Sequence, residues 1–278
     1  MDLALDIQGL TKRFGDTLAV DEVTLGVPQG AVFGLLGPDG AGKSTLIRML
    51  ATALAPGGGD ALVFGESIVS RPAAVKPRIG YLSQRFSLYP DLTVDENLAF
   101  FARIRGVPRI EIRSRSKRLL EFAGLTGFGD RRAEHLSGGM KQKLALAATL
   151  MHEPDLLLLD EPTTGVDPVS RREFWRIISG LHREGITVLL ATPYMDEAER
   201  CTTVAFMDEG RILLHDTPAA LKARVPHPYA VDGEADMETT FAYLAEEARL
   251  SRAQEPPAET PADEAPAAAP DSGDGEPE

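Results

Sequence analysis

The sequence predicts an α/β fold with a largely parallel sheet and a helical insertion. Apolar runs of strand length alternate with helical stretches along most of the chain. The run at 31–37 is followed by a glycine-rich turn and a helix, and the run at 156–160 ends in a carboxylate. Strands buried on both faces of a parallel sheet are apolar throughout, which is the pattern of these runs. We expect strands at 31–37, 79–83, 156–160, 187–191 and 204–208.

Local signals place the first helices between these strands. Residues 44–53 follow the glycine-rich turn as a helix. From about 85 to 135 the spacing of apolar residues becomes helical, and Thr93 and Glu96 have the spacing of a capping box. A second helical stretch runs over 110–123. We therefore expect a helical insertion inside an α/β domain.

The later part of the folded region is predicted to contain a hairpin and one more helix. Gly210 and Arg211 stand between two short β-rich runs and have the character of a hairpin turn. Residues 237–249 are expected to form a short helix. Phe241 and Leu244, three residues apart, share one face of that helix and dock it.

Composition indicates a globular chain without a membrane span. The sequence is 43% hydrophobic and 26% charged. No apolar run approaches the ~20 residues of a transmembrane helix. The N-terminus lacks the basic and apolar regions of a signal peptide. The single cysteine, Cys201, fits a reducing compartment. We expect a cytoplasmic protein that acts at a membrane only through a partner.

The net charge of −13 is concentrated near the C-terminus. Residues 253–278 carry eight acidic side chains and no Lys or Arg, and they are rich in Pro and Ala. Such a segment is expected to be a disordered acidic tail, for which a role in solubility suffices. The predicted domains are 1–226 (the α/β domain, with a helical subdomain at about 85–135), a partly helical extension at 227–252 and the tail at 253–278. The acidic balance argues against binding of nucleic acid.

The strongest motif follows the strand at 31–37. It satisfies G-x-x-x-x-G-K-[ST] and stands between a strand and a helix, as phosphate binding requires. Backbone N–H groups of the turn and the helix N-terminus attract an anion. We expect Lys43 to contact the β- and γ-phosphates and the Ser44 hydroxyl to bind Mg²⁺. The motif predicts binding of ATP or GTP and comprises Gly37, Pro38, Asp39, Gly40, Ala41, Gly42, Lys43, Ser44 and Thr45.

Two adjacent carboxylates, Asp160 and Glu161, end the apolar strand at 156–160. Carboxylates at the end of a buried strand are costly unless a cation neutralises them. A Mg²⁺ ion held by Asp160 would do so, and Glu161 would then stand where it can polarise an attacking water.

A second phosphate-binding helix N-terminus is predicted at Ser137. This residue is a good N-cap for a helix that runs to about residue 151. Gly138 and Gly139 leave backbone N–H groups free to point at an anion. One chain does not need two such termini for one nucleotide.

With these motifs, the sequence resembles the ATP-binding subunit of an ABC transporter over roughly residues 3–220. The LSGGM segment at 136–140 is similar to the family's signature loop, which contacts the γ-phosphate of ATP held by the opposite subunit. The resemblance thus implies a face-to-face pair of such domains, with ATP and Mg²⁺ as ligands. It also implies a RecA-like P-loop core and an antiparallel β subdomain beside the helical one.

The resemblance assigns further roles. Phe14 falls at the aromatic position that stacks on adenine, and Gln84 at the Q-loop, which senses Mg²⁺ and the membrane partner. Residues 164–167 match the D-loop, although Val166 replaces the usual leucine. By this comparison the catalytic residues are Lys43, Gln84 and Glu161, and the metal-binding residues are Ser44, Gln84 and Asp160.

The amino-acid sequence of residues 81–98 is similar to that of bacterial drug- and antibiotic-export ATPases. This likeness implies a polytopic membrane permease as partner, a second ABC ATPase subunit and a position at the inner face of the cell membrane. Soluble translation factors of this type carry two such domains, and DNA-repair ATPases carry a long coiled coil between the P-loop and the signature. The chain shows neither feature.

One position departs from the family pattern. The strand after the D-loop usually leads to a histidine that contacts the γ-phosphate, and Pro193 occupies that position here. Proline has no side-chain donor or acceptor for this role. We expect the fold to tolerate it, with Thr192 capping the next helix and Pro193 in its first position. The chain's histidines lie elsewhere in the sequence, at His135, His152, His182, His215 and His227.

Three interpretations remain open at this point. In the first, the chain binds ATP, hydrolyses it poorly and lends its signature loop to a different ATPase with a complete site. In the second, it forms a homodimer in which Glu161, Lys43 and Mg²⁺ sustain slow turnover. A third, from another functional class, is a largely non-hydrolytic regulatory module that acts through a partner ATPase.

Overall fold

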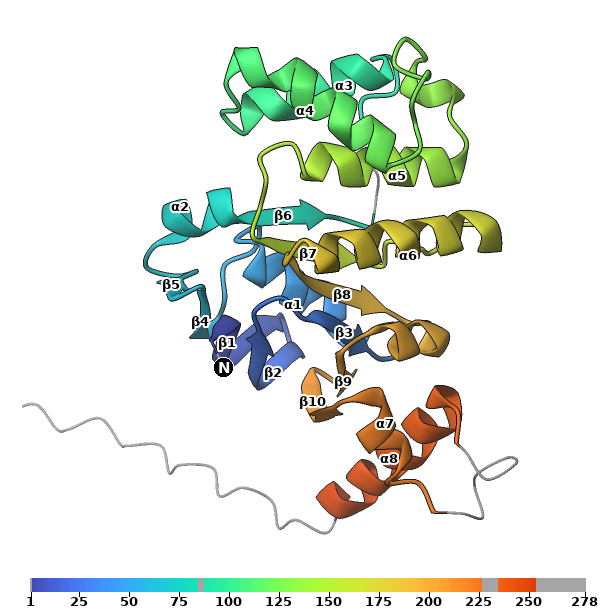
Figure 1. Cartoon of the computed structure of the whole chain (residues 1–278). Coiled ribbons are helices and arrows are strands. Elements are labelled where there is room, and N and C mark those ends of the chain that lie inside the picture. The colour runs from blue at the N-terminus through green and yellow to red at the C-terminus, as the bar shows by residue number, and fades with distance from the viewer. Residues whose placement is uncertain (1, 85–87, 227–234, 254–278) are drawn as a thin grey trace, which may run out of the picture.

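A computed structural model describes residues 2–84, 88–226 and 235–253 of the chain (Figure 1). The acidic segment predicted to be disordered lies outside the described residues, except for Ala253, the last residue of helix α8. His227 lies outside them as well. No helix in the described ranges is long and apolar enough to span a membrane.

Two sheets form the core of the molecule, and the predicted α/β class is confirmed. The larger sheet has the strand order β10-β9-β3-β8-β7-β6. Five of its strands run parallel, and β10 pairs antiparallel with β9 at one edge. Its strands are β3 (Val32–Leu36), β6 (Ile79–Leu82), β7 (Leu156–Asp160), β8 (Thr187–Thr192), β9 (Thr203–Asp208) and β10 (Arg211–Asp216).

The smaller sheet is antiparallel and was predicted only through the family resemblance. Its strand order is β2-β1-β4-β5. The strands are β1 (Leu3–Phe14), β2 (Thr17–Pro28), β4 (Gly58–Val63) and β5 (Glu66–Ser67). Together with α1 (Lys43–Leu50) this sheet covers one face of the larger sheet.

The remaining helices are distributed around these sheets (Figure 1). Helices α3 (Val94–Ile104), α4 (Arg109–Phe122) and α5 (Gly138–Thr149) form a helical lobe at one end. Helix α6 (Pro168–Arg183) lies beside the larger sheet, and α7 (Pro218–Lys222) packs against α8 (Met237–Ala253) at the other end. Shorter elements are α2 (Pro72–Val75) and the 3₁₀ turns η1 (Lys76–Arg78), η2 (Ala133–His135) and η3 (Met195–Arg200).

The apolar character of the central strands follows from burial on both faces. Leu157 and Leu159 of β7 join the core formed with α5, α6 and the helical lobe. Leu156 and Leu158 face the opposite core, which the smaller sheet and α1 complete. A strand between two cores has no polar face, which is why its sequence is a continuous apolar run.

Several local predictions are confirmed. Thr93 accepts a hydrogen bond from the backbone N–H of Glu96 at 3.2 Å, and the Thr93 N–H donates to Glu96 Oε2 at 2.8 Å, closing the capping box. The hairpin between β9 and β10 is also present. Its turn residues are Glu209 and Gly210, both with positive φ, while Arg211 is already the first residue of β10. The predicted turn was therefore one residue late.

The predicted C-terminal helix is present as α8. Leu244 is fully buried, and the Phe241 ring contacts Phe206 of β9 edge-on with centroids 5.0 Å apart. These two side chains dock the helix as expected.

Candidate functional site

The parallel register brings the polar ends of four strands to one edge of the larger sheet. Leu36 of β3 is opposite Thr192 of β8, and Asp160 of β7 is opposite Ala191 of the same strand. Leu82 at the end of β6 is paired with Leu159. Ligands of open α/β sheets bind at the carboxyl ends of the strands. The site residues predicted after β3, β6 and β7 therefore meet at the expected edge.

The loop between β3 and α1 is held in a conformation that requires glycine at two positions. A Cβ atom on Gly37 would lie 2.1 Å from the carbonyl oxygen of Met207, and one on Gly42 would lie 2.2 Å from that of Ala19. Gly42 also has φ +102°. It is the N-cap of α1 and supplies no side-chain cap. The first N–H groups of a helix have no partner within it, so those of α1 remain available to an anion.

The Lys43 ammonium group lies inside this loop. Its side chain is only 3% exposed, and Nζ donates to the carbonyl oxygens of Gly37 at 2.8 Å and Pro38 at 2.9 Å. Burial lowers the pKa of Lys43, while the nearby charges of Glu161, Asp39 and Asp160 oppose that shift. The charge is thus placed beneath the loop, where a phosphate would rest.

Ser44 and Asp160 form a paired oxygen site. The Ser44 hydroxyl donates to Asp160 Oδ1 at 2.7 Å, although the two residues are far apart in sequence. Asp160 is 3% exposed, and burial raises the pKa of its carboxyl group; the bond from Ser44 opposes the shift and Glu161 adds to it. A buried carboxylate beside a hydroxyl is the kind of donor set that Mg²⁺ prefers. These two residues fit a divalent cation.

Glu161 is held directly beside this pair. Its backbone has φ +48°, a strained value for a side chain other than glycine, and its N–H donates to Ala191 O at 2.9 Å. Gln84 Nε2 donates to Glu161 Oε2 at 2.8 Å, and Thr164 Oγ1 reaches the same oxygen at 3.3 Å. Lys43 Nζ lies 3.9 Å from Glu161 Oε1. The structure thus brings Lys43, Gln84 and Glu161 together, as the sequence predicted.

Replacing Asp160 with Asn should stabilise the ligand-free protein. The native pKa of Asp160 is raised, so ionising Asp160 lowers the unfolding free energy. This loss is absent below the ordinary carboxyl pKa of about 3.9, grows as pH rises, and is complete once pH exceeds the native pKa. At neutral pH we expect Asp160→Asn to raise the unfolding free energy by about 1 kcal/mol, or roughly 2–4 °C in Tm. Thermal unfolding from pH 4 to 8, with exposed Asp130→Asn as control, measures the gain. A gain independent of pH would contradict this explanation.

The second predicted phosphate-binding helix terminus is present but stands apart. Ser137 is the N-cap of α5, and its Oγ accepts from the Met140 N–H at 3.3 Å. Gly138 is exposed, with open space where a Cβ would be. Gly139 packs on Ser170 of α6 so closely that a Cβ would lie 2.2 Å from Ser170 Oγ. Within the described ranges, no hydrogen bond or ion pair joins residues 137–139 to residues 37–45.

Phe14 lies at the rim of the same region. It ends β1, is 47% exposed and has Lys12 Nζ 5.6 Å from its ring centroid. Strand β2 of the same hairpin touches the loop through Ala19, next to Gly42. An exposed aromatic ring on an element that contacts the loop is suited to stacking on a base.

The predicted cap at Thr192 is wrong. The 3₁₀ turn η3 begins at Met195, with Tyr194 as its N-cap and no side-chain cap. Thr192 Oγ1 instead accepts from the Tyr194 N–H at 3.1 Å, closing a local turn that contains Pro193. The Arg171 guanidinium group stacks over the Tyr194 ring, 4.2 Å from its centroid. The segment therefore forms a local turn before η3, and its contact with α6 could not be seen from spacing alone.

Glu197 is a buried residue that the sequence argument missed. It is fully buried, and its Oε1 accepts from Thr163 Oγ1 at 2.7 Å and from Trp175 Nε1 at 3.1 Å. It thereby joins η3 to the segment after Glu161 and to α6. Tyr81 was also missed: burial, with the charge of Asp160, raises its pKa to about 12. No local pattern singles out Glu197, which lies in η3, and the only sequence signal for Tyr81 is a polar side chain within the short apolar strand β6.

The described histidines do not substitute for the missing one. His152 Nε2 lies 2.9 Å from Ile79 O, at the amino end of β6, away from the site. His135 is exposed beside Glu134, and His215 is exposed in β10. Within residues 2–84, 88–226 and 235–253, no histidine forms a hydrogen bond or ion pair with Glu161 or Lys43.

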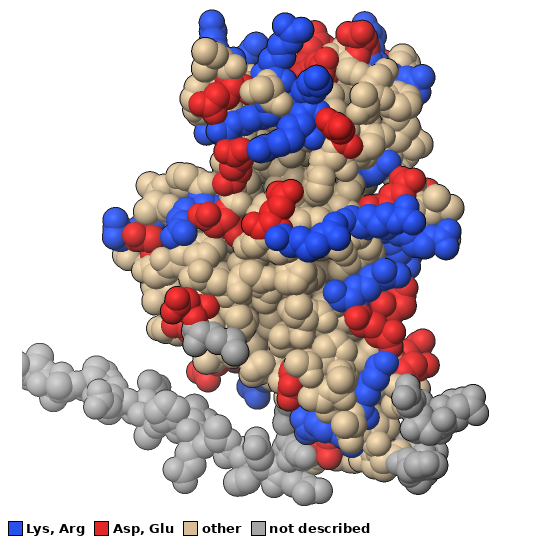
Figure 2. All heavy atoms as spheres, in the orientation of Figure 1, with Lys and Arg blue, Asp and Glu red and all other residues tan. Residues whose placement is uncertain are grey.

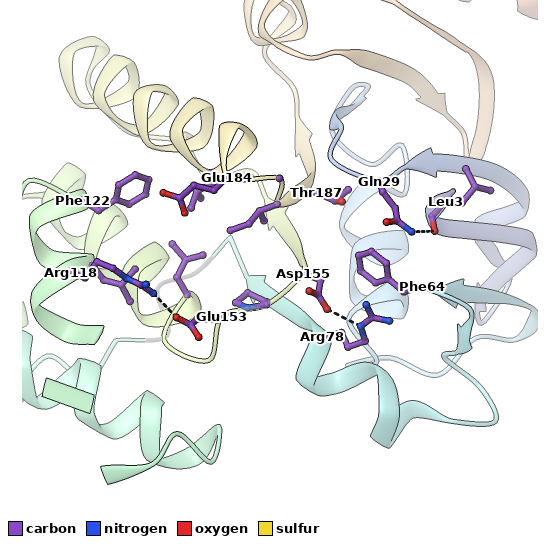
Figure 3. A pocket seen from close by; sticks show the side chains of 16 residues that line it. Leu3, Gln29, Phe64, Arg78, Arg118, Phe122, Glu153, Asp155, Glu184 and Thr187 are labelled. Carbon is purple, nitrogen blue, oxygen red and sulfur yellow. Dashed lines mark hydrogen bonds and ion pairs between the residues drawn. The ribbon is translucent and has the colours of Figure 1, made fainter. Parts of the chain in front are cut away.

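A hollow of about 790 Å³ lies at the opposite ends of the strands (Figure 3). Arg78 and Asp155, which precede β6 and β7, form an ion pair at 2.8 Å there, and Arg118 pairs with Glu153 at 2.6 Å. These two ion pairs account for the charged side chains of the hollow other than Glu184, and the hollow lies away from the carboxyl edge that holds Asp160.

Comparisons with known proteins agree with this geometry. Residues 20–164 match the protein family described as ABC transporter. The chain is 43% identical over 223 residues to the probable multidrug ABC transporter ATP-binding protein YbhF of Escherichia coli K12; the match covers 80% of this chain but only 39% of that protein. It is 45% identical over 221 residues to the daunorubicin/doxorubicin resistance ATP-binding protein DrrA of Streptomyces peucetius; this match covers 79% of this chain and 67% of DrrA. Among solved structures, cbiO1 of Clostridium perfringens, part of the ABC transporter complex cbiONQ, superposes with TM-score 0.74 at 31% identity. The superposition covers 81% of this chain and 92% of cbiO1.

Proposed function

The chain belongs to the ABC transporter family, and from that membership we propose that it is an ATP-binding subunit that drives a membrane permease. The observation that carries the proposal is the cluster at the carboxyl edge of the sheet. There Lys43, the Ser44–Asp160 pair and Glu161 with Gln84 surround the free N-terminus of α1.

The proposed reaction is hydrolysis of ATP. A water oxygen attacks the γ-phosphorus, the bond to the β-phosphate breaks, and ADP and phosphate leave. Lys43 opposes the negative charge of the phosphates. Glu161, oriented by Gln84 and Thr164, accepts a proton from the water. Mg²⁺, held by Ser44 and Asp160, would neutralise charge on the phosphoryl oxygens.

Pairing of two such domains is the second part of the proposal. In the described part of the chain, residues 137–139 at the α5 N-terminus form no hydrogen bond or ion pair with the nucleotide loop of their own chain, and Ser137 and Gly138 are exposed. We propose that it contacts the nucleotide bound by a second ABC subunit, which is either a second copy or a different ATPase. Pro193 favours a different ATPase with a complete site, because this chain then contributes its signature loop and needs little turnover of its own.

The relatives support an exporter placed at the inner face of the cell membrane through its permease. DrrA and YbhF are named for drug resistance and multidrug transport. The proposed substrate class is therefore a drug-like molecule carried outward by the permease. A largely regulatory ATP-binding module remains the competing proposal, because Pro193 removes one catalytic contact.

Pairing can be tested at Gly138, where a side chain has room. In a Glu161→Gln background, which retains bound ATP, we expect Gly138→Asp to leave ATP binding intact and abolish ATP-dependent association, because its carboxylate would repel the phosphate. Light scattering with ATP and Mg²⁺ measures association. The control is Ile110→Asp, which adds the same charge at a position 90% exposed on the helical lobe.

The outcomes of this experiment separate the interpretations. Self-association that Gly138→Asp abolishes supports a homodimer. A chain that binds ATP but stays monomeric supports pairing with a different ATPase. Association that persists in Gly138→Asp contradicts pairing through this loop, and absence of any ATP-dependent stabilisation contradicts the proposed function itself.

A further inference from the structure

Four arginines form a basic surface that the nucleotide site does not use. Arg172, Arg176 and Arg183 share one exposed face of α6, and Arg200 ends the neighbouring turn η3. With Trp175 and Ser179 they line a shallow hollow of about 370 Å³. Figure 2 shows a band of Lys and Arg side chains along the surface where Figure 1 places α6. We call these four residues the arginine patch.

The charges of the arginine patch are not neutralised locally. In the part of the chain that the structure describes, none of its four guanidinium groups has an ion pair. Carboxylates nearby on the same elements have other partners: Glu173 pairs with Lys143 at 2.8 Å, and Glu199 pairs with Lys222. Four like charges on one small surface repel one another, so an anionic group bound there would stabilise the surface.

The sequence supplies a matching polyanion. Residues 254–278 contain eight Asp or Glu residues and no Lys or Arg. This segment follows α8, and α8 packs against η3, the element that holds Arg200. Charge complementarity and position in the chain therefore both favour the chain's own acidic segment as the occupant.

The segment is long enough to reach the arginine patch. Helix α8 has 17 residues and is about 25 Å long. The 25 residues that follow can span at most about 80–90 Å, at roughly 3.3–3.6 Å per residue. Even if the chain must retrace the full length of α8, about eight extended residues suffice. Most of the acidic residues, from Asp263 onward, then remain for binding.

We propose that the acidic segment 254–278 binds the arginine patch on α6 and η3 of the same chain. Tethering makes this an intramolecular event with an effective concentration of about 1 mM, so individually weak ion pairs suffice. The contact covers the patch and shields it from other polyanions. Because the interaction is electrostatic and exposed, salt weakens it.

The chain offers a built-in reporter for this contact. Trp175 is the only tryptophan in the sequence and lines the patch, with the Arg200 guanidinium 5.8 Å from its ring. An acceptor dye on Ser272→Cys, in a Cys201→Ala background, reports the approach of the segment by energy transfer from Trp175. We expect transfer in the full-length chain at low salt that does not depend on protein concentration. At ~1 M salt, where the Debye length is about 3 Å, transfer should be lost.

Matched variants separate the arginine patch from general charge. Replacing all four patch arginines with Gln should reduce transfer to its high-salt level. Replacing four exposed basic residues of the helical lobe, Arg103, Arg109, Arg113 and Lys117, with Gln should leave it unchanged. A third variant, with the eight acidic residues of 254–278 changed to amides, leaves the patch intact and should also lose transfer. Emission of Trp175 without dye, together with Tm, confirms that each variant is folded.

Several outcomes overturn the proposal. One is absence of transfer in the unaltered chain; another is transfer that survives the patch substitutions. Loss of transfer in the helical-lobe variant alone would place the segment on that lobe. Transfer that rises with protein concentration would assign the contact to a second copy. If the segment stays remote while the patch substitutions abolish binding to phosphatidylglycerol vesicles, the patch faces a membrane instead.

Discussion

Replacing Lys43 with Ala should abolish ATP-dependent stabilisation of the chain and lower any phosphate release by at least ~10²–10³-fold. The side chain is 3% exposed and ties the loop together through the carbonyl oxygens of Gly37 and Pro38. Bound phosphates would bring several negative charges into a low-dielectric site, and Lys43 is the basic side chain positioned within that loop. Alanine removes both the charge and the ties.

The effect of Lys43→Ala on the ligand-free protein should be much smaller. Burial lowers the pKa of Lys43, so the buried ammonium group destabilises the folded state and replacing it with alanine removes this cost. At the same time, the carbonyl groups of Gly37 and Pro38 lose a hydrogen-bond donor, which is destabilising. These effects oppose each other. Measurements of Tm with and without ATP and Mg²⁺ separate binding from folding, and Lys76→Ala, an exposed lysine, serves as the control. An ATP-induced shift in Tm that survives in Lys43→Ala would show that the nucleotide binds elsewhere.

The parts of the site that could be predicted from sequence are those encoded by local spacing. The order of strand, glycine-rich loop and helix places Lys43 and Ser44, and an apolar run that ends in two carboxylates places Asp160 and Glu161. The parallel sheet then brings the two segments together, because its strands all present their carboxyl ends at one edge. Ser44 and Asp160, each expected to bind Mg²⁺, are thereby brought within hydrogen-bond distance, 2.7 Å, of each other.

Other parts depend on contacts that no local pattern encodes. Glu197 is buried by hydrogen bonds from Thr163 and Trp175, which lie 34 and 22 residues away in the sequence. The turn after β8 differs from the prediction: Thr192 bonds to the Tyr194 N–H rather than capping η3, and Tyr194 also contacts Arg171 of α6. The strained φ of Glu161, +48°, was not predicted either; it accompanies a hydrogen bond from the Glu161 N–H to Ala191 of the neighbouring strand, which no local pattern encodes.

The missing histidine is the feature with the most direct consequence for activity. Pro193 follows β8, and the Ala191 carbonyl of that strand accepts the Glu161 N–H at 2.9 Å. Pro193 therefore lies two residues after Ala191, the residue that contacts Glu161, the proposed catalytic base. Proline is half-buried there and offers no polar side-chain atom. The turn closed by Thr192 and the Tyr194 N–H does not depend on the proline ring, so the backbone should accept another residue.

Pro193→His should therefore raise ATP turnover by ~10²–10³-fold, because a polar contact to the transition state is worth a few kcal/mol. Pro193→Ala, which relaxes the backbone without adding a ring nitrogen, should not. The gain must vanish when Lys43→Ala or Glu161→Gln is added, since the histidine can act only on a bound phosphate and a positioned water. Steady-state phosphate release is measured for the unaltered chain and for these four variants. Brisk turnover in the unaltered chain would contradict the interpretation that it relies on a different ATPase, and an unchanged rate in Pro193→His would show that residue 193 does not face the γ-phosphate.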